Sequence, residues 1–262
     1  MAIATVEFFS ECLRRCVNIK VILPNDVVGA SEEENAKPFR TLLLLNGYTQ
    51  QNTEWIYNSQ IVELAGKYHL CVIMPSGENS FYLDGEATGR QYGTFVGKEL
   101  LSYVRKTFRV SEKREDTFVG GISMGGFGAL HTGLQFPEIY GRLFAFSSAL
   151  IQHEVEEMKP KKGNEIANYE YYKLMFGEPS LLKNSENNPE VLIRKCQEQK
   201  IVLPEIYMVC GTEDFLLEPN RRFESFLTSQ KVEHIYYEST GEHNFGFWNQ
   251  YLEPALKWLC DE

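Results

Sequence analysis

Ser123 lies in a glycine-rich turn of a kind that can carry a nucleophile. It stands between Gly121 and Gly125 in the stretch "TFVGGISMGGFGAL", where β-forming residues precede it and a helix-compatible apolar run follows. A serine at a sharp strand-to-helix turn holds its hydroxyl away from the backbone, in the arrangement called a nucleophile elbow. The two glycines allow a close backbone approach that a Cβ would block. The alternative interpretation is a packing turn without chemistry.

A serine hydroxyl becomes a useful nucleophile only when a base removes its proton and a carboxylate orients that base. Behind an elbow of this kind the expected chain order is serine, acid, histidine. Four histidines follow Ser123, but His131 falls in the expected elbow helix, His153 in an irregular segment and His234 at the start of a β-run. His243 lies in the loop of "STGEHNFGFW" between the last β-run and the last helical segment. We therefore predict His243 as the base, with an uncatalytic surface histidine as the alternative.

The acid is expected in the loop after the preceding strand, "IYMVCGTEDFLLEPN". Asp214 is the preferred candidate because its short side chain is followed by apolar Phe215 and Leu216, which suits a partly buried orienting role. Glu213 is the reserve candidate. An ordinary acidic helix cap is the alternative reading of the same residues.

The oxyanion of an acyl-transfer intermediate needs two backbone N–H donors. One is expected from the residue after the nucleophile, Met124, and the other from the loop after an early strand. The strand "LLLL" ends in Asn46-Gly47, so the second donor is predicted to be the amide of Tyr48.

The rest of the chain reads as repeated strand and helix. Two β-rich runs at 5–13 and 16–24 predict an antiparallel pair at a sheet edge. Later short apolar runs are typical of strands buried on both faces of a parallel sheet, and they cover 41–45, 70–75, 117–122, 143–149, 205–211 and 233–239. Helix-compatible segments separate them at 53–67, 92–108, 124–136, 217–230 and 245–260.

This alternation predicts an α/β fold with a mostly parallel central sheet, helices on both faces and an antiparallel N-terminal edge. A length of 262 residues fits a single domain over 1–262. Residues 150–200 carry helical patterns without an apolar strand, so we expect a helical insertion there, either a lid or pocket wall or a peripheral decoration. An acidic surface loop is expected at 29–38.

The charge and composition of the chain disfavour several classes of binding partner. The formal net charge of −10 disfavours nucleic acid and anionic membrane surfaces. We see neither a signal peptide nor an apolar run of eighteen residues, which predicts a cytoplasmic protein without membrane insertion. The six cysteines are predicted to be buried thiols and not disulfides, and "HEVEE" at 153–157 lacks the second histidine of a zinc motif. No metal and no cofactor are predicted.

The chain resembles the esterase D-like branch of the α/β-hydrolases, and especially the bacterial tributyrin esterases. The resemblance covers nearly the whole length and includes "VNIKVILP", "LLLLNGYTQQNTEW", "GENSFYLD", "GGISMGGFGAL", "CGTEDFL" and "GEHNFGFW". It implies an α/β-hydrolase fold, a triad of Ser123, Asp214 and His243, and an oxyanion hole of the Tyr48 and Met124 amides. Asn46 departs from the family, since many relatives have histidine at this position.

The resulting hypothesis is a serine carboxylesterase acting on short acyl esters, acetyl groups on carbohydrates among them. Trp55 and Tyr82 are candidates for an apolar substrate pocket, with a core role as the alternative. An S-formylglutathione hydrolase-type thioesterase and a feruloyl esterase remain open. "GYTQQ" lacks the cysteine usual in S-formylglutathione hydrolases. A non-catalytic binding module is the alternative from a different class. The partner is a small-molecule ester, and the sequence leaves a homo-oligomer open.

Overall fold

A computed structural model describes residues 1–27 and 37–261 of the chain. The acidic loop expected at 29–38 therefore lies, up to residue 36, outside the described residues.

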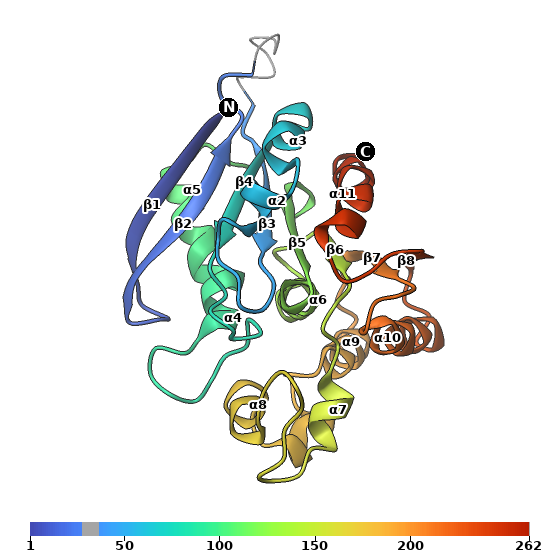
Figure 1. Ribbon diagram of the computed structural model, residues 1–262. Helices are drawn as coiled ribbons and strands as arrows, with labels where there is room; N and C mark the ends of the chain where they lie inside the picture. Colours follow the sequence, from blue (N-terminus) through green and yellow to red (C-terminus); the bar gives the residue numbers. More distant parts are fainter. Residues whose placement is uncertain (28–36, 262) are drawn as a thin grey trace.

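A single eight-stranded sheet runs through the described part of the molecule in the order β1-β2-β4-β3-β5-β6-β7-β8. β1 pairs antiparallel with β2, and β2 pairs antiparallel with β4, whereas every later pairing in the sheet is parallel. This confirms the mostly parallel sheet and its antiparallel N-terminal edge (Figure 1). The strands are β1 (Ala2–Ser10), β2 (Arg15–Leu23), β3 (Arg40–Leu45), β4 (Leu70–Pro75), β5 (Thr117–Ile122), β6 (Arg142–Phe146), β7 (Glu205–Gly211) and β8 (His234–Ser239).

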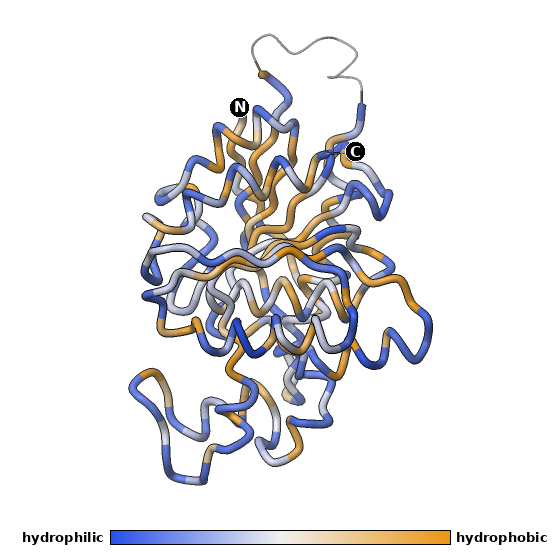
Figure 2. The backbone as a smooth tube through the Cα atoms, turned by 90° about the vertical axis from the view of Figure 1, so that its right-hand side faces the viewer, coloured by the Kyte–Doolittle hydropathy of each residue, from blue (hydrophilic) through white to orange (hydrophobic). Residues whose placement is uncertain are grey.

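Helices cover both faces of the sheet because the central strands are apolar on both sides. In β3, Leu43 and Leu45 belong to one core with residues of α5, α6, α9 and α10, whereas Leu42 and Leu44 belong to a second core with residues of α2, α3 and α11. Figure 2 shows the hydrophobic strands running through the centre of the molecule. The α-helices are α2 (Glu54–Asn58), α3 (Ile61–Lys67), α4 (Tyr92–Thr94), α5 (Leu100–Thr107), α6 (Met124–Gln135), α7 (Gln152–Glu156), α8 (Tyr169–Phe176), α9 (Pro189–Glu198), α10 (Leu217–Ser229) and α11 (Phe245–Cys260). A π-helical turn, η1 (Phe95–Glu99), and two 3₁₀ turns, η2 (Arg114–Asp116) and η3 (Pro179–Asn184), complete the helical segments of the described residues.

Two of the expected helical segments are interrupted. The segment 53–67 divides into α2 and α3 at Ser59, whose backbone is extended and whose hydroxyl accepts the amide of Ile61 at 3.2 Å. The segment 92–108 contains the π-helical turn η1 between α4 and α5. The spacing of apolar residues predicts which face of a helix is buried, but it does not reveal a short interruption of the α-helix.

β8 differs from the expectation of a strand buried on both faces. All six of its residues are at least partly exposed, and Tyr237 is 49% exposed. The reason is its place at the end of the sheet, where β7 is its only strand neighbour in the strand order.

The segment 150–200 is helical, as expected, and contains α7, α8, η3 and α9. α9 packs on α6 through Leu192 and Ile193, which are buried in the same core, so this helix belongs to the layer that covers the sheet. α7 and α8 lie together at the lower end of the view in Figure 1, beyond the sheet.

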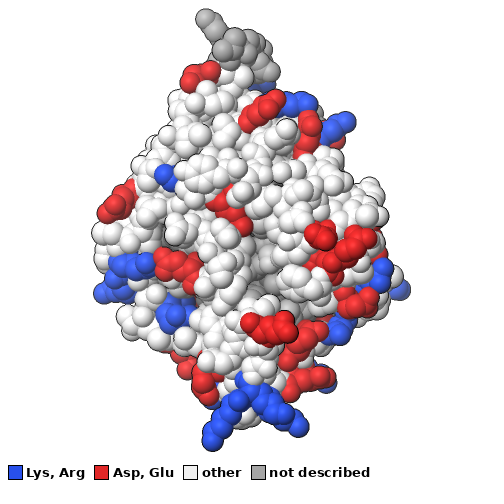
Figure 3. Space-filling model, viewed as in Figure 1, with Lys and Arg blue, Asp and Glu red and all other residues white. Residues whose placement is uncertain are grey.

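The six cysteines are free thiols, as predicted, but only Cys71, Cys196 and Cys210 are buried. Acidic and basic side chains are interspersed over the face drawn in Figure 3. Within residues 1–27 and 37–261, no helix is both long enough and apolar enough to cross a bilayer.

Candidate active site

Ser123 stands at a sharp turn between β5 and α6. Its backbone has φ +54° and ψ −119°, a region that residues other than glycine rarely occupy. The turn is fixed from both sides, because the Ser123 amide donates to the carbonyl of Phe146 at 2.9 Å and the Ser123 carbonyl accepts the amides of Phe127 and Ala149 at 3.0 and 2.9 Å. Surrounding hydrogen bonds of this kind are what maintain a strained backbone at a functional position.

The glycines around Ser123 allow three backbone segments to meet. A Cβ on Gly121 would lie 2.3 Å from the carbonyl oxygen of Gly125, and a Cβ on Gly125 would lie 2.4 Å from that of Leu45 at the end of β3. Real Cβ atoms do not approach backbone this closely. The close approach expected from the sequence is therefore present.

We expect Gly125→Ala to destabilise the fold by about 3 kcal/mol or more, because the added methyl group meets backbone that cannot move aside. For a chain of this size the loss lowers the unfolding temperature by roughly 6–12 °C. Circular dichroism during heating measures it. Gly66→Ala in α3 is the matched control, since its Cβ would contact only the flexible end of Met1. Equal melting of the Gly125 variant and wild type would contradict the close-approach argument.

The structure brings together Ser123, His243 and Asp214, which lie far apart in the sequence. His243 Nε2 is 3.0 Å from Ser123 Oγ, and His243 Nδ1 is 2.8 and 3.0 Å from the two carboxylate oxygens of Asp214. All three side chains follow the carboxyl ends of strands β5, β7 and β8, where open α/β sheets bind their ligands.

Burial of Asp214 fixes the orientation of the imidazole. The Asp214 side chain is fully buried, and one of its oxygens also accepts the amide of Leu216 at 2.8 Å. An ionised carboxylate only accepts hydrogen bonds, so the proton of a neutral imidazole lies on Nδ1 and Nε2 is left to accept the Ser123 hydroxyl. This arrangement can transfer a proton from the serine to the histidine.

Aromatic rings enclose His243 on two sides. Phe215 lies 4.6 Å from the imidazole between ring centroids, and Trp248 lies 5.0 Å away in an edge-on arrangement. Phe215 is 64% exposed, although an apolar neighbour of Asp214 was expected to favour burial there; Leu216 is the buried one of the pair. Sequence reasoning missed Trp248 and did not foresee the contact between Phe215 and His243, because ring contacts with a loop histidine carry no periodic signal.

The other candidate residues are engaged elsewhere. His131 is buried, its Nε2 lies 2.9 Å from the carbonyl of Glu186, and burial lowers its pKa to about 4. His153 Nε2 lies 2.6 Å from Glu190, and His234 Nδ1 lies 2.8 Å from its neighbouring carbonyl at Val232.

Glu213, the reserve acid, has its carboxylate at the amide of Gly241 and is exposed. It therefore supports the loop before the histidine, whereas Asp214 contacts the imidazole itself.

The loop after β3 is held rigidly by the side chain of Asn46. Its Nδ2 donates to the carbonyls of Gly47 and Gln50 at 2.8 and 2.9 Å, and its Oδ1 accepts the Gly77 amide at 3.0 Å and the Tyr82 hydroxyl at 3.1 Å. The Asn46 side chain therefore holds the loop in place.

The two predicted oxyanion donors belong to segments that adjoin the nucleophile. Met124 begins α6 directly after Ser123, and Gly47 places the Tyr48 loop close to the serine, since a Cβ on Gly47 would lie 3.7 Å from that of Ser123. Among the described residues, neither the Tyr48 amide nor the Met124 amide donates to a protein acceptor.

Trp55 and Tyr82 do not line a pocket, which corrects the sequence-based suggestion. Their exposed fractions are 1% and 0%. The Trp55 indole donates to the Leu45 carbonyl at 3.0 Å, and the Tyr82 hydroxyl lies 3.1 Å from the Asn46 carbonyl. Both side chains pack in the core and hold the chain at the end of β3 and in the loop that follows it.

One acidic residue of this loop region was missed by sequence reasoning. Glu54 is 8% exposed, and its carboxylate accepts the amide of Gly47 at 2.8 Å. The only signal available was an acidic residue directly before a tryptophan in "NTEW".

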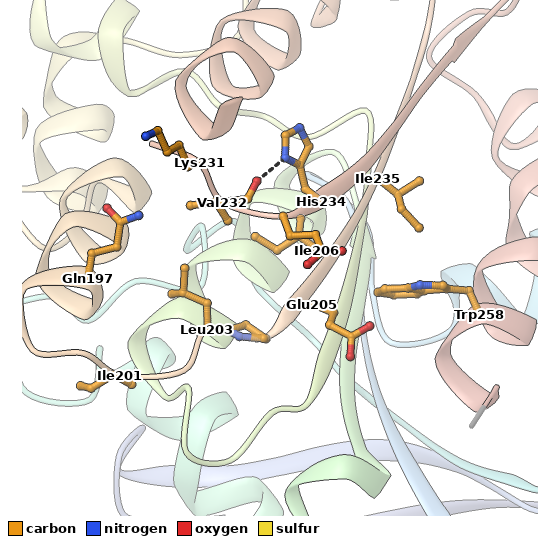
Figure 4. A pocket seen from close by; sticks show the side chains of 12 residues that line it. Gln197, Ile201, Leu203, Glu205, Ile206, Lys231, Val232, His234, Ile235 and Trp258 are labelled. Atoms are coloured by element: carbon orange, nitrogen blue, oxygen red, sulfur yellow. Dashed lines mark hydrogen bonds between the residues drawn. The ribbon is translucent and has the colours of Figure 1, made fainter. Parts of the chain in front are cut away.

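A separate pocket of about 640 Å³ lies at the other end of the sheet. Figure 4 shows it between the amino ends of β7 and β8, where Glu205 and His234 begin the strands and Trp258 forms one wall. Because the triad follows the carboxyl ends, this pocket is not part of the candidate site.

Comparison with known proteins agrees with this arrangement. The model of the Esterase family, described as "Putative esterase", matches residues 10–259. An acetyl esterase of Caldicellulosiruptor saccharolyticus is 38% identical over 261 residues, which cover 99% of this chain and 98% of that protein.

Two solved structures from Staphylococcus aureus are also similar. The fluorophosphonate-binding serine hydrolase F has a TM-score of 0.86 at 26% identity, covering 100% of this chain and 99% of that one. The S-formylglutathione hydrolase FrmB has a TM-score of 0.84 at 26% identity, with 99% of each chain covered. The chain therefore belongs to the Esterase family, in its esterase D-like branch on the α/β-hydrolase fold, and is a carboxylic ester hydrolase.

Proposed function

We propose that this carboxylesterase hydrolyses short-chain acyl esters, acetyl esters first among them, through an acyl-enzyme on Ser123. The observation that carries the proposal is the continuous hydrogen-bonded series from Ser123 through His243 to Asp214, with distances of 3.0 and 2.8 Å. The acyl length is inferred from the relative that is 38% identical along almost its whole length and is named an acetyl esterase.

In the proposed mechanism, Ser123 Oγ attacks the ester carbonyl carbon while His243 Nε2 takes the hydroxyl proton. The carbonyl oxygen becomes an oxyanion, which the amides of Tyr48 and Met124 stabilise. Collapse of this intermediate breaks the carbon–oxygen bond to the alcohol, which leaves with the proton from His243. Water then attacks the acyl-enzyme by the same route and releases the carboxylic acid.

Asp214 acts through His243 in both halves of the reaction. Its buried carboxylate keeps the Nδ1 proton in place and stabilises the imidazolium that forms in each transition state.

The segment 150–200 is proposed as a wall of the substrate site. Tyr171 of α8 donates to the Asn79 carbonyl at 2.6 Å, and its ring lies edge-on to Tyr48 with centroids 5.9 Å apart. Asn79 in turn accepts the amide of Thr49 at 2.7 Å through its side chain. α8 therefore touches the oxyanion loop, which a purely peripheral decoration would not need to do.

A thioesterase of the S-formylglutathione hydrolase type is the second candidate. The similarity to the S. aureus S-formylglutathione hydrolase over 99% of both chains favours it. The feruloyl esterase alternative has only the similarity to a ferulic acid esterase structure at 20% identity, and that similarity supports the fold alone. Cytoplasmic location remains a prediction from the sequence, which leaves a homo-oligomer open.

A substrate panel tests the proposal. We expect kcat/KM to be highest for p-nitrophenyl acetate and to fall by about tenfold or more between butyrate and octanoate. S-formylglutathione and methyl ferulate are measured in parallel, with acetylated xylo-oligosaccharides as a carbohydrate ester. Faster turnover of S-formylglutathione than of the acetyl esters would replace the proposal by the thioesterase, and turnover of methyl ferulate alone would replace it by the feruloyl esterase.

A further inference from the structure

Glu54 is a buried carboxyl group at the oxyanion loop to which the mechanism above gives no role. It begins α2 and is 8% exposed. One carboxylate oxygen accepts the Gly47 amide at 2.8 Å. The next residue, Trp55, holds the preceding end of β3 through the carbonyl of Leu45. The start of α2 therefore fixes the chain on both sides of Asn46.

The carboxyl group also lies close to the nucleophile. A Cβ built on Gly47 would be 3.6 and 3.7 Å from the two oxygens of Glu54 and 3.7 Å from the Cβ of Ser123. Gly47 thus lies next to both the Glu54 carboxyl group and the turn where the oxyanion is proposed to form. A negative charge on this buried carboxyl group opposes a second negative charge nearby, because the interaction is weakly screened away from bulk water.

We infer that Glu54 is a positioning residue which holds the oxyanion loop through the Gly47 amide, and that its carboxyl group supports catalysis when neutral and slows it when ionised. The inference rests on the proposed function, because it concerns the oxyanion of the Ser123 reaction. Glu54 acts through the loop and through its field, and does not touch the reacting atoms.

The surroundings of Glu54 make its ionisation relevant near neutral pH. Burial raises its pKa to about 7, and the Gly47 hydrogen bond offsets only part of this effect. Among the described residues no neighbouring charge contributes to the shift. The titratable group facing it from the loop after β4 is Tyr82, whose own pKa is raised mainly by burial and further by the Glu54 charge. Across Ser123 the facing groups are His243 and Asp214.

Glu54→Gln separates the charge from the hydrogen bond, since its amide oxygen still accepts the Gly47 N–H. Because loss of the His243 proton affects both enzymes alike, the readout is the ratio of kcat in Glu54→Gln to kcat in wild type for p-nitrophenyl acetate. We expect this ratio to rise as pH rises through about 7 and to reach on the order of tenfold at pH 8.5. Glu54→Ala removes the acceptor as well, and its kcat at pH 6 should be about tenfold below wild type with KM unchanged. Glu63→Gln is the matched control, because it removes an exposed carboxylate of α3. Its kcat should follow the wild-type pH profile.

Stability gives a second readout that does not depend on activity. A folded-state pKa above the usual 4.5 means that the folded chain loses stability between pH 4.5 and about 7 and carries the full penalty above that range. Glu54→Gln should therefore melt higher than wild type at pH 8.5, and the difference should shrink toward pH 5.

Overlapping pH profiles of wild type and Glu54→Gln would overturn the charge effect. An unchanged kcat at pH 6 in Glu54→Ala would overturn the positioning role. Rates are corrected by those of Ser123→Ala. If that variant hydrolyses the ester as fast as wild type, the failure lies with the proposed nucleophile and not with Glu54.

Discussion

Ser123→Ala is expected to lower kcat for p-nitrophenyl acetate by about 10⁴–10⁶-fold with little change in KM. The substitution removes the only atom that the proposed mechanism bonds to the acyl group, and it leaves the imidazole 3.0 Å from an empty position. The oxyanion donors and the binding site survive, so a residual rate above that of water should remain. The measurement is steady-state hydrolysis combined with labelling by a fluorophosphonate probe, which the variant should not take up.

Ser148→Ala is the matched control for this experiment. Ser148 is fully buried near the elbow, and its hydroxyl has no partner among the described residues. It should be labelled and should turn over substrate at close to the wild-type rate. Full activity of Ser123→Ala, or labelling of that variant at another residue, would show that the nucleophile is not Ser123.

Asp214→Asn is expected to reduce kcat by about 10³–10⁴-fold while the fold is retained. The buried amide that replaces the carboxylate favours the wrong tautomer of His243, because its NH₂ group can donate to Nδ1, and Nε2 then carries the proton. It also leaves the imidazolium of the transition state without a counter-charge. Steady-state kinetics measure the loss, and circular dichroism checks that the variant is folded.

Glu213→Gln decides between the two acids that the sequence offered. Its side chain faces the Gly241 amide and not the imidazole, so its kcat should stay within about tenfold of wild type. A larger loss of kcat in Glu213→Gln than in Asp214→Asn would show that Glu213, and not Asp214, orients His243.

The succession of strands and helices along the chain was predictable because alternating apolar runs and amphipathic segments follow the pattern of burial. The elbow was predictable for a similar reason, since Gly121 and Gly125 stand where backbone segments approach to 2.3–2.4 Å of a Cβ position. The loop histidine and the acid followed from chain order along the sheet. These features depend on local composition and on topology.

What the sequence did not disclose depends on contacts between distant segments. Trp55 and Tyr82 are aromatic residues near the oxyanion loop, and only the structure shows that they support it from the core. Glu54 looks like an ordinary acidic first-turn residue until Gly47 is placed against it. The half-exposed state of β8 likewise follows from its place in the strand order, where β7 is its only strand neighbour.

Trp248 of α11 connects His243 to the core of the protein. Its indole donates to Ser147 at 2.9 Å, its ring packs edge-on against His243, and Asn244 caps the helix that carries it. Partial detachment of α11 would thus displace the imidazole while the remaining strands stay paired. On gradual heating, esterase activity should therefore be lost a few degrees below the temperature at which the circular dichroism signal changes. Activity would then detect the detachment of one helix that circular dichroism does not resolve.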